Sequence, residues 1–216
     1  MYRYEQPIKR QRSSKYGCNY WTFWSRKVRR NVAVFSNLEY ENLLTLEMEP
    51  EVEWYCEYPM ETTAYVGGKE EAISFDVWVY YADGHDAFQG VSYSKDDGYH
   101  KETAFQAKWC TQNGLHYEHR SEKNIHNGKF FIRNLAVLAA RARRFETPSI
   151  TADQMVIGFL SEIQRDTIDN LSRSGRFEDG RTLDYLADLY YRGKVSFHNI
   201  SHECLSGGTE VIYIGK

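Results

Sequence analysis

The patterned part of the chain opens with a short amphipathic helix followed by strands. Ser36-Asn37-Leu38-Glu39 is typical of a capping box, and apolar residues at helical spacing predict a helix that continues until Pro50. Residues 52–56 alternate apolar and polar side chains, which predicts a strand that ends before Pro59, and a second strand is expected near 63–66. This region therefore begins as a helix followed by β-structure.

The clearest strand pattern comes next and carries an unexplained carboxylate. Residues 72–81 form a β-rich run with Asp76 at its centre, and Asp83-Gly84 behind it predicts a hairpin whose return strand covers 87–93. A helix and then a strand are expected within 103–118. The order of helix, four strands, helix and strand predicts an α/β or α+β domain.

The remainder of the chain has a mostly helical pattern. The predicted elements are helices over 130–145, within 152–173 (a pair) and over 182–191, and strands over 195–198 and 210–214. Three helices followed by a small hairpin form the outline of a winged-helix module over residues 147–216. The many acidic side chains of this segment favour a protein partner over DNA.

Composition places the chain among globular proteins. Its 216 residues, 42% hydrophobic and 26% charged, suffice for one large domain or two small ones. No apolar run approaches the length of a membrane span, and no apolar segment follows the N-terminal basic residues, so neither a membrane protein nor a secreted one is expected. The four cysteines include no Cys-x-x-Cys pair, which favours a reducing cytoplasm over a disulfide or zinc framework.

Charge divides the chain more sharply than its total of −3 suggests. Residues 1–30 carry nine basic side chains and one acidic one, a net charge of +8, whereas residues 31–216 carry a net charge of −11. Aromatic residues interleave with these cations, which suits phosphate neutralisation and stacking on nucleic acid; a solvated tail that packs on the acidic body is the alternative. The basic residues assigned to DNA binding are Lys9, Arg10, Arg12, Lys15, Arg26, Lys27, Arg29 and Arg30.

Asp76 is the first candidate for chemistry, because a carboxylate inside a strand needs a partner or a function. With a two-residue hairpin loop, position 76 pairs with 91 and Gln89 shares the face of Asp76; a three-residue loop brings Gly90 and Ser92 to that face instead. Glu39 would add a further oxygen donor for Mg²⁺ or Mn²⁺. The structural alternative is that Glu39 only completes the capping box and that Asp76 lies on an exposed edge.

Several of these segments carry a family resemblance. Ser36 to Glu47 and Pro50 to Pro59 resemble the opening of TnsA, the endonuclease subunit of heteromeric bacterial transposons of the Tn-seven type. Phe75 to Val79 with Asp83-Gly84 resembles the central strand of that family, and Phe105 to Tyr117 resembles the helix and strand that follow it. The resemblance spans nearly the whole chain, since TnsA proteins also carry a C-terminal winged-helix domain.

The resemblance implies a restriction-endonuclease-like mixed sheet flanked by helices, followed by a mostly helical winged-helix domain. The implied divisions are a basic N-terminal arm over 1–31, a nuclease domain over 32–146 and the winged-helix domain over 147–216. The implied activity is Mg²⁺-dependent cutting of double-stranded DNA at the 5′ ends of a transposon. A DDE-type partner transposase cuts and joins the 3′ ends, and an AAA+ transposition ATPase regulates the complex, which would act in the bacterial cytoplasm.

By position, the resemblance makes Glu39 the helix carboxylate and Asp76 the central metal ligand, with Gln89 as the third ligand. The chain departs from the family at its Glu/Gln-x-Lys pattern. If Gln89 matches the glutamine, a valine replaces the lysine; if Gly90-Val91-Ser92 is the match, both the acid and the lysine are missing. Lys95 is the candidate substitute for that cation.

Three functions follow as hypotheses. The first is the metal-dependent endonuclease that the family resemblance implies. The second is a catalytically degenerate, TnsA-like architectural subunit that binds DNA and bridges transposase and ATPase. The third is a DNA-binding regulator that acts through its winged helix, which the acidic C-terminal segment disfavours.

Overall fold

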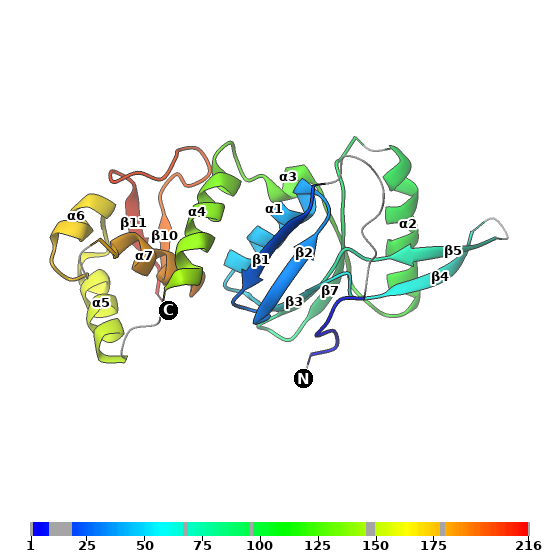
Figure 1. Ribbon diagram of the computed structural model, residues 1–216, viewed down its shortest axis with the longest axis horizontal. Helices are drawn as coiled ribbons and strands as arrows, with labels where there is room; N and C mark the ends of the chain where they lie inside the picture. The colour runs from blue at the N-terminus through cyan, green and yellow to red at the C-terminus, as the bar shows by residue number, and fades with distance from the viewer. Residues whose placement is uncertain are drawn as a thin grey trace. The chain divides into compact units, whose positions relative to one another are not determined.

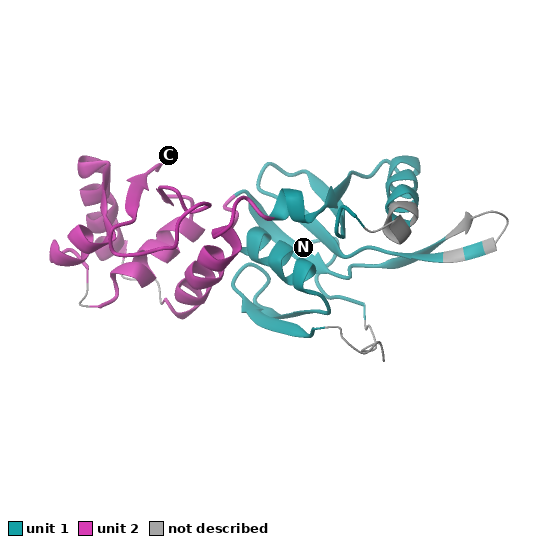
Figure 2. Cartoon of the chain, turned by 90° about the horizontal axis from the view of Figure 1, so that it is seen from above, with its two compact units in different colours: residues 1–47, 51–125 teal, residues 48–50, 126–216 magenta. Residues whose placement is uncertain are grey.

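A computed structural model of the chain describes residues 2–8, 19–66, 69–95, 97–145, 150–177 and 180–215. Four of the DNA-binding candidates, Lys9, Arg10, Arg12 and Lys15, lie outside these residues. The chain divides into two compact units, residues 1–47 with 51–125 (unit 1) and residues 48–50 with 126–216 (unit 2) (Figure 2). Each unit has its own sheet and its own helices.

Unit 1 is built on a four-stranded mixed sheet in the order β3-β6-β7-β8 (Figure 1). The elements of this core are α1 (Asn37–Met48), β3 (Val52–Glu57), β6 (Val77–Tyr81), β7 (Asp86–Val91), α2 (Asp97–Gln112) and β8 (Tyr117–Arg120). Strands β3, β6 and β7 are antiparallel neighbours, whereas β8 runs parallel to β7. A parallel pair needs a long crossover, and α2 supplies it. The prediction of an α/β fold with a mixed sheet flanked by helices is confirmed.

The two helices cover opposite faces of this sheet. On one face, Leu43 and Leu46 of α1 pack with Val77 and Val79 of β6 in one buried cluster. On the other face, residues of α2 pack with Trp78, Phe75 and Phe88; the α2 members are Phe105, Trp109 and Cys110. The period-two alternation of β6 and β7 separates these two cores.

The first helix begins as its sequence predicts. The Ser36 hydroxyl accepts a hydrogen bond from the Glu39 amide at 3.1 Å, and the Glu39 carboxylate accepts one from the Phe35 amide at 3.0 Å. These bonds satisfy backbone donors that have no partner inside the helix. The helix ends at Met48, two residues before Pro50.

Two features of unit 1 differ from the sequence-based expectation. The expected strand over 72–81 is broken at Phe75 and Asp76: β5 (Lys69–Ser74) leaves the sheet to pair with β4 (Glu61–Val66) as a separate two-stranded ribbon. The second feature is an antiparallel hairpin of β1 (Trp21–Ser25) and β2 (Arg30–Val34), where the sequence indicated a basic arm. Phe23, Val32 and Val34 of the hairpin are buried in the same core as α1. A short helix, α3 (Glu122–Ile125), closes the unit.

Unit 2 combines helices with a small antiparallel sheet in the order β10-β11-β9. Its elements are α4 (Phe131–Arg144), α5 (Ile150–Ile163), β9 (Arg165–Thr167), α6 (Ile168–Arg173), α7 (Thr182–Tyr191), β10 (Val195–Phe197) and β11 (Glu210–Tyr213). The helix predicted over 182–191 matches α7, whereas the short β9 was not predicted. None of the helices described in either unit is long and apolar enough to span a bilayer.

Candidate functional site

The loop between β6 and β7 decides which residues accompany Asp76. The Tyr81 amide donates to the His85 carbonyl at 3.0 Å, which leaves three residues, Ala82 to Gly84, in the loop. Gly84 adopts a φ of +92°, the left-handed conformation typical of the last residue of such a loop. Val77 consequently pairs with Gln89. The two-residue loop considered from the sequence is therefore wrong, and the three-residue alternative is the one observed.

Asp76 lies at the corner where the chain enters β6, and its backbone is bonded on both sides. Its amide donates to the Gln89 carbonyl at 3.1 Å, and its carbonyl accepts from the Tyr58 amide at 2.8 Å. Its carboxylate Oδ2 accepts a hydrogen bond from the Val91 amide at 2.7 Å. No described strand pairs with Val91 on this side, because β5 has left the sheet. The side chain thus replaces the missing strand partner of Val91, which gives this carboxylate a structural task.

In the observed register, the pair that follows Val77 and Gln89 places position 76 beside Gly90. Gly90 faces α2. A Cβ on Gly90 would lie 2.3 Å from the Tyr117 hydroxyl oxygen and 2.4 Å from Gln106 Oε1. These two groups are themselves hydrogen-bonded at 2.6 Å. Burial is the largest cause of the raised pKa of Tyr117; the side chain of Thr103 opposes it and the negative charge of Asp76 adds to it, so the phenol stays protonated. Only a residue without a side chain fits at position 90 while this bond is kept.

Ser92 is the next residue on the same face and is also engaged. It is buried, and its hydroxyl lies 2.7 Å from His119 Nε2 on β8. Gly90 pairs with His119 across the parallel β7–β8 ladder. The positions that accompany Asp76 on this face therefore hold a glycine and a serine bound to an imidazole.

Gln89 faces α1 instead, within a buried polar network. Its Oε1 accepts from Asn42 Nδ2 at 2.9 Å, and its Nε2 donates to Glu118 Oε2 at 2.8 Å. Arg120 Nε donates to Asn42 Oδ1 at 3.1 Å, which ties β8 to α1. Gln89 is fully buried, so both ends of its amide need these partners.

The network includes residues that the sequence analysis did not single out. Asn42 is fully buried on a helix face otherwise formed by leucines, and that break in the apolar pattern was the available signal. Glu118 and Arg120 are two positions apart on β8, and no comparable feature of the sequence marks them. Asn42, and not Glu39, is the α1 residue bonded to Gln89.

Lys95 lies in the turn after β7 and is exposed. The preceding residue, Ser94, donates both its amide, at 2.8 Å, and its hydroxyl to the Glu122 carboxylate. These hydrogen bonds lower the pKa of Glu122. The turn that carries Lys95 is thus attached to α3.

The β7 positions beside Asp76 supply no second carboxylate. A hard divalent cation takes several oxygen ligands, commonly with more than one carboxylate. Beside Asp76 the register places a glycine and Ser92, while Gln89 is turned toward α1. Within the described part of the chain, no cluster of three or more His, Cys, Asp and Glu side chains has the geometry to hold a metal ion.

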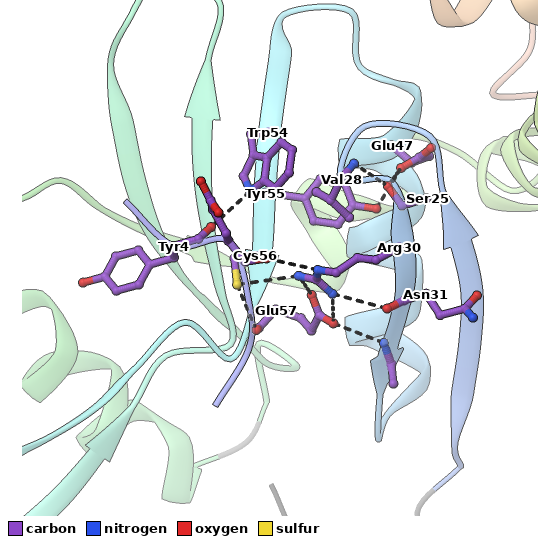
Figure 3. A network of polar contacts seen from close by, with 12 residues as sticks. Tyr4, Ser25, Val28, Arg30, Asn31, Glu47, Trp54, Tyr55, Cys56 and Glu57 are labelled. Atoms are coloured by element: carbon purple, nitrogen blue, oxygen red, sulfur yellow. Dashed lines mark hydrogen bonds and ion pairs between the residues drawn. The ribbon is translucent and has the colours of Figure 1, made fainter. Parts of the chain in front are cut away.

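Arg30 and Lys27, both DNA-binding candidates, contact groups within unit 1, and Figure 3 shows the contacts of Arg30. Arg30 forms a two-pronged ion pair with Glu57, at 2.6 Å and 2.7 Å. Lys27 Nζ donates to the Val52 carbonyl. Arg29, in contrast, is exposed on the turn between β1 and β2. The basic residues of this segment therefore serve different purposes.

In comparisons with known proteins, no family model matches this chain, and no curated protein matches it. The functional interpretation consequently rests on the motifs of the sequence and on the geometry of the two units.

Proposed function

We propose that this chain is a TnsA-like subunit of a heteromeric DNA transposase that binds transposon-end DNA and bridges the DDE-type transposase and the AAA+ ATPase without cutting DNA itself. The observation that carries this proposal is the register at Asp76. Beside this aspartate stand Gly90 and Ser92, where the family has an acid or glutamine and a lysine.

The architecture of unit 1 supports the family assignment. With the β4–β5 ribbon set aside, the element order is helix, three antiparallel strands, crossover helix and a parallel strand. This is the core order of restriction-endonuclease-like folds, and Asp76 directly precedes the second core strand, β6, at the position where those folds place a metal-binding aspartate. A fold alone does not establish an activity, so the cutting step is judged from the site.

The topology of unit 2 supports a winged-helix module. Its order of helix, strand, two helices and two strands, with β9 paired to β11, is the arrangement of that module, and α4 precedes it. Residues 147–216 carry ten acidic and seven basic side chains. An acidic module of this kind suits a protein partner, which we assign to the transposase–ATPase interface.

The chemistry of the Asp76 face supports a subunit that does not cut. Cleavage of a phosphodiester by such nucleases needs a metal-bound water and a cation near the developing charge. Ser92 supplies a neutral hydroxyl that is already bound to His119, and Gly90 supplies no side chain at all. Lys95 lies on a turn anchored to Glu122 through Ser94.

Cleavage and assembly are tested together with end DNA, the transposase and the ATPase, in Mg²⁺ and separately in Mn²⁺. We expect the three proteins to form a complex on the ends, with cuts at the 3′ ends only. Asp76→Asn should leave assembly and cleavage products unchanged, and omission of this chain should reduce assembly.

Two results would overturn the proposal. Nicks at the 5′ ends that disappear in Asp76→Asn would establish the metal-dependent endonuclease instead. Binding of DNA through unit 2, without assembly with either protein, would favour a winged-helix regulator.

A further inference from the structure

The β1–β2 hairpin has one buried face and one exposed face. Phe23, Val32 and Val34 point into the core of unit 1, whereas Trp24 is 50% exposed. Asn31, the cross-strand partner of Trp24, is exposed as well. The outer face of the hairpin thus presents a large aromatic ring that the core does not use.

A buried carboxylate of α1 holds the end of β1 in place (Figure 3). Glu47 is 1% exposed and accepts hydrogen bonds from the Ser25 hydroxyl at 2.6 Å, the Arg26 amide at 2.8 Å and the Tyr55 hydroxyl at 2.8 Å. Ser25 in turn accepts from the Val28 amide at 3.2 Å. The residue directly after Trp24 is therefore fixed by side-chain and backbone bonds.

A second buried carboxylate holds the start of β2. Glu57 of β3 pairs with Arg30 through both of its oxygens. Its Oε1 also accepts from the Ala33 amide at 3.4 Å. Both ends of the hairpin turn are consequently anchored to the core, so the outer face is presented in one defined conformation. Such preorganisation reduces the entropy cost of binding.

Arg29 extends from the turn between these two anchors. It follows the buried Val28, adopts a φ of +51° and is exposed. For a residue with a long side chain, this left-handed conformation is uncommon and needs support from its surroundings. Val28 and Arg30 provide that support, because both are held in the core of unit 1.

We propose that the outer face of the β1–β2 hairpin enters the major groove of duplex DNA, with Trp24 against the groove wall and Arg29 on a phosphate. The major groove admits a two-stranded β-ribbon. Residues 21–34, which form the hairpin and its turn, carry four basic side chains and no acidic one, and Arg29 is the exposed cation that would meet the phosphate backbone. An exposed tryptophan on a rigid support is typical of a recognition surface. The inference rests on the proposed function and assigns the DNA contact within it.

The test is fluorescence anisotropy of a labelled 30-base-pair duplex titrated with the full chain, over a series of salt concentrations. We expect Trp24→Ala to weaken binding about tenfold and Arg29→Ala to weaken it by a similar factor. Arg29→Ala should also reduce the slope of log K against log salt by about 0.9. Trp24→Phe should retain most of the affinity.

Lys108→Ala is the matched control, because Lys108 is an exposed cation of the same unit on α2. It should leave affinity within about twofold of the wild-type value. Urea midpoints of all four variants within error of the wild type would show that the hairpin still folds. Unchanged binding by Trp24→Ala and Arg29→Ala would overturn the inference while leaving the proposed function standing.

The remaining outcomes are also decisive. A preference for single-stranded DNA or RNA over the duplex would overturn the groove assignment. A wild-type chain with no affinity for DNA would overturn the inference as well. The assembly assay with transposase and ATPase then decides separately whether the bridging role survives.

Discussion

Replacing Arg30 with alanine removes the cationic partner of a buried carboxylate. The side chain of Glu57 is 2% exposed and that of Arg30 is 14% exposed, so water cannot compensate for the loss. Burial alone would lower the pKa of Arg30, but the hydrogen bonds and the charge of Glu57 reverse this and raise the pKa. Breaking a buried pair by removing one partner costs about 3–5 kcal/mol. Arg30→Ala should therefore remove a large part of the free energy of unfolding, which is roughly 5–15 kcal/mol for a typical domain.

Urea unfolding followed by circular dichroism measures this cost. With a slope of about 2 kcal/mol per molar urea, the midpoint of unit 1 should fall by about 2 M. The double variant Arg30→Met with Glu57→Leu should recover most of the lost stability, because apolar residues of similar volume replace buried pairs well.

A loss below about 1 kcal/mol in Arg30→Ala would refute this reasoning. If that variant kept its stability and lost DNA affinity, Arg30 would instead be a DNA contact, as its position in a basic segment first indicated.

Two further predictions concern the sheet of unit 1 and the acid stability of unit 2. Gly90→Ala should destabilise unit 1 by about 1–3 kcal/mol in urea unfolding. Tyr117→Phe should relieve part of this loss, because the contact at 2.3 Å involves the Tyr117 hydroxyl. An equal loss from Gly90→Ala in the wild type and in Tyr117→Phe would contradict the expected crowding. Hydrogen bonds from Arg192 lower the pKa of Asp153, so their stabilisation is complete above the ordinary aspartate pKa of about 3.9 and is lost as pH falls through the depressed value. The melting temperature of unit 2 should thus fall below about pH 4, and the difference in melting temperature between the wild type and Asp153→Asn should shrink there. A difference that does not change with pH would count against the ion pair.

Local signals in the sequence were sufficient for several elements. The capping box at Ser36 predicted the start of α1, and apolar spacing predicted α7 over the observed residues. These elements depend on side chains within a few residues of one another. The order of helices and strands in the mixed sheet followed from the same local patterns.

The hairpin of β1 and β2 was missed because its stabilising partners are distant. Its polar and basic residues indicated a basic arm that either binds nucleic acid or packs on the acidic body, whereas Ser25 and Arg30 are satisfied by Glu47 and Glu57, more than twenty residues away. Charge counting cannot distinguish an arginine that faces a phosphate from one that faces a buried carboxylate.

Which residues accompany Asp76 in the candidate site depended on whether the loop between β6 and β7 has two residues or three. Ala82-Asp83-Gly84-His85 is compatible with a two- or a three-residue loop, and the choice moves Gln89 from the face of Asp76 to the face of α1. Strand propensity gave no means to choose. The three-residue loop with Gly84 at φ +92° resolves this ambiguity.

The anchoring of the β1–β2 hairpin has a consequence for the order of folding during synthesis. An isolated two-stranded hairpin is at best marginally stable in water. The ribosome produces residues 21–34 before their buried acceptors at positions 47 and 57. Strands β1 and β2 therefore cannot form their anchoring hydrogen bonds until α1 and β3 have been synthesised, so the two carboxylates determine when this hairpin becomes stable.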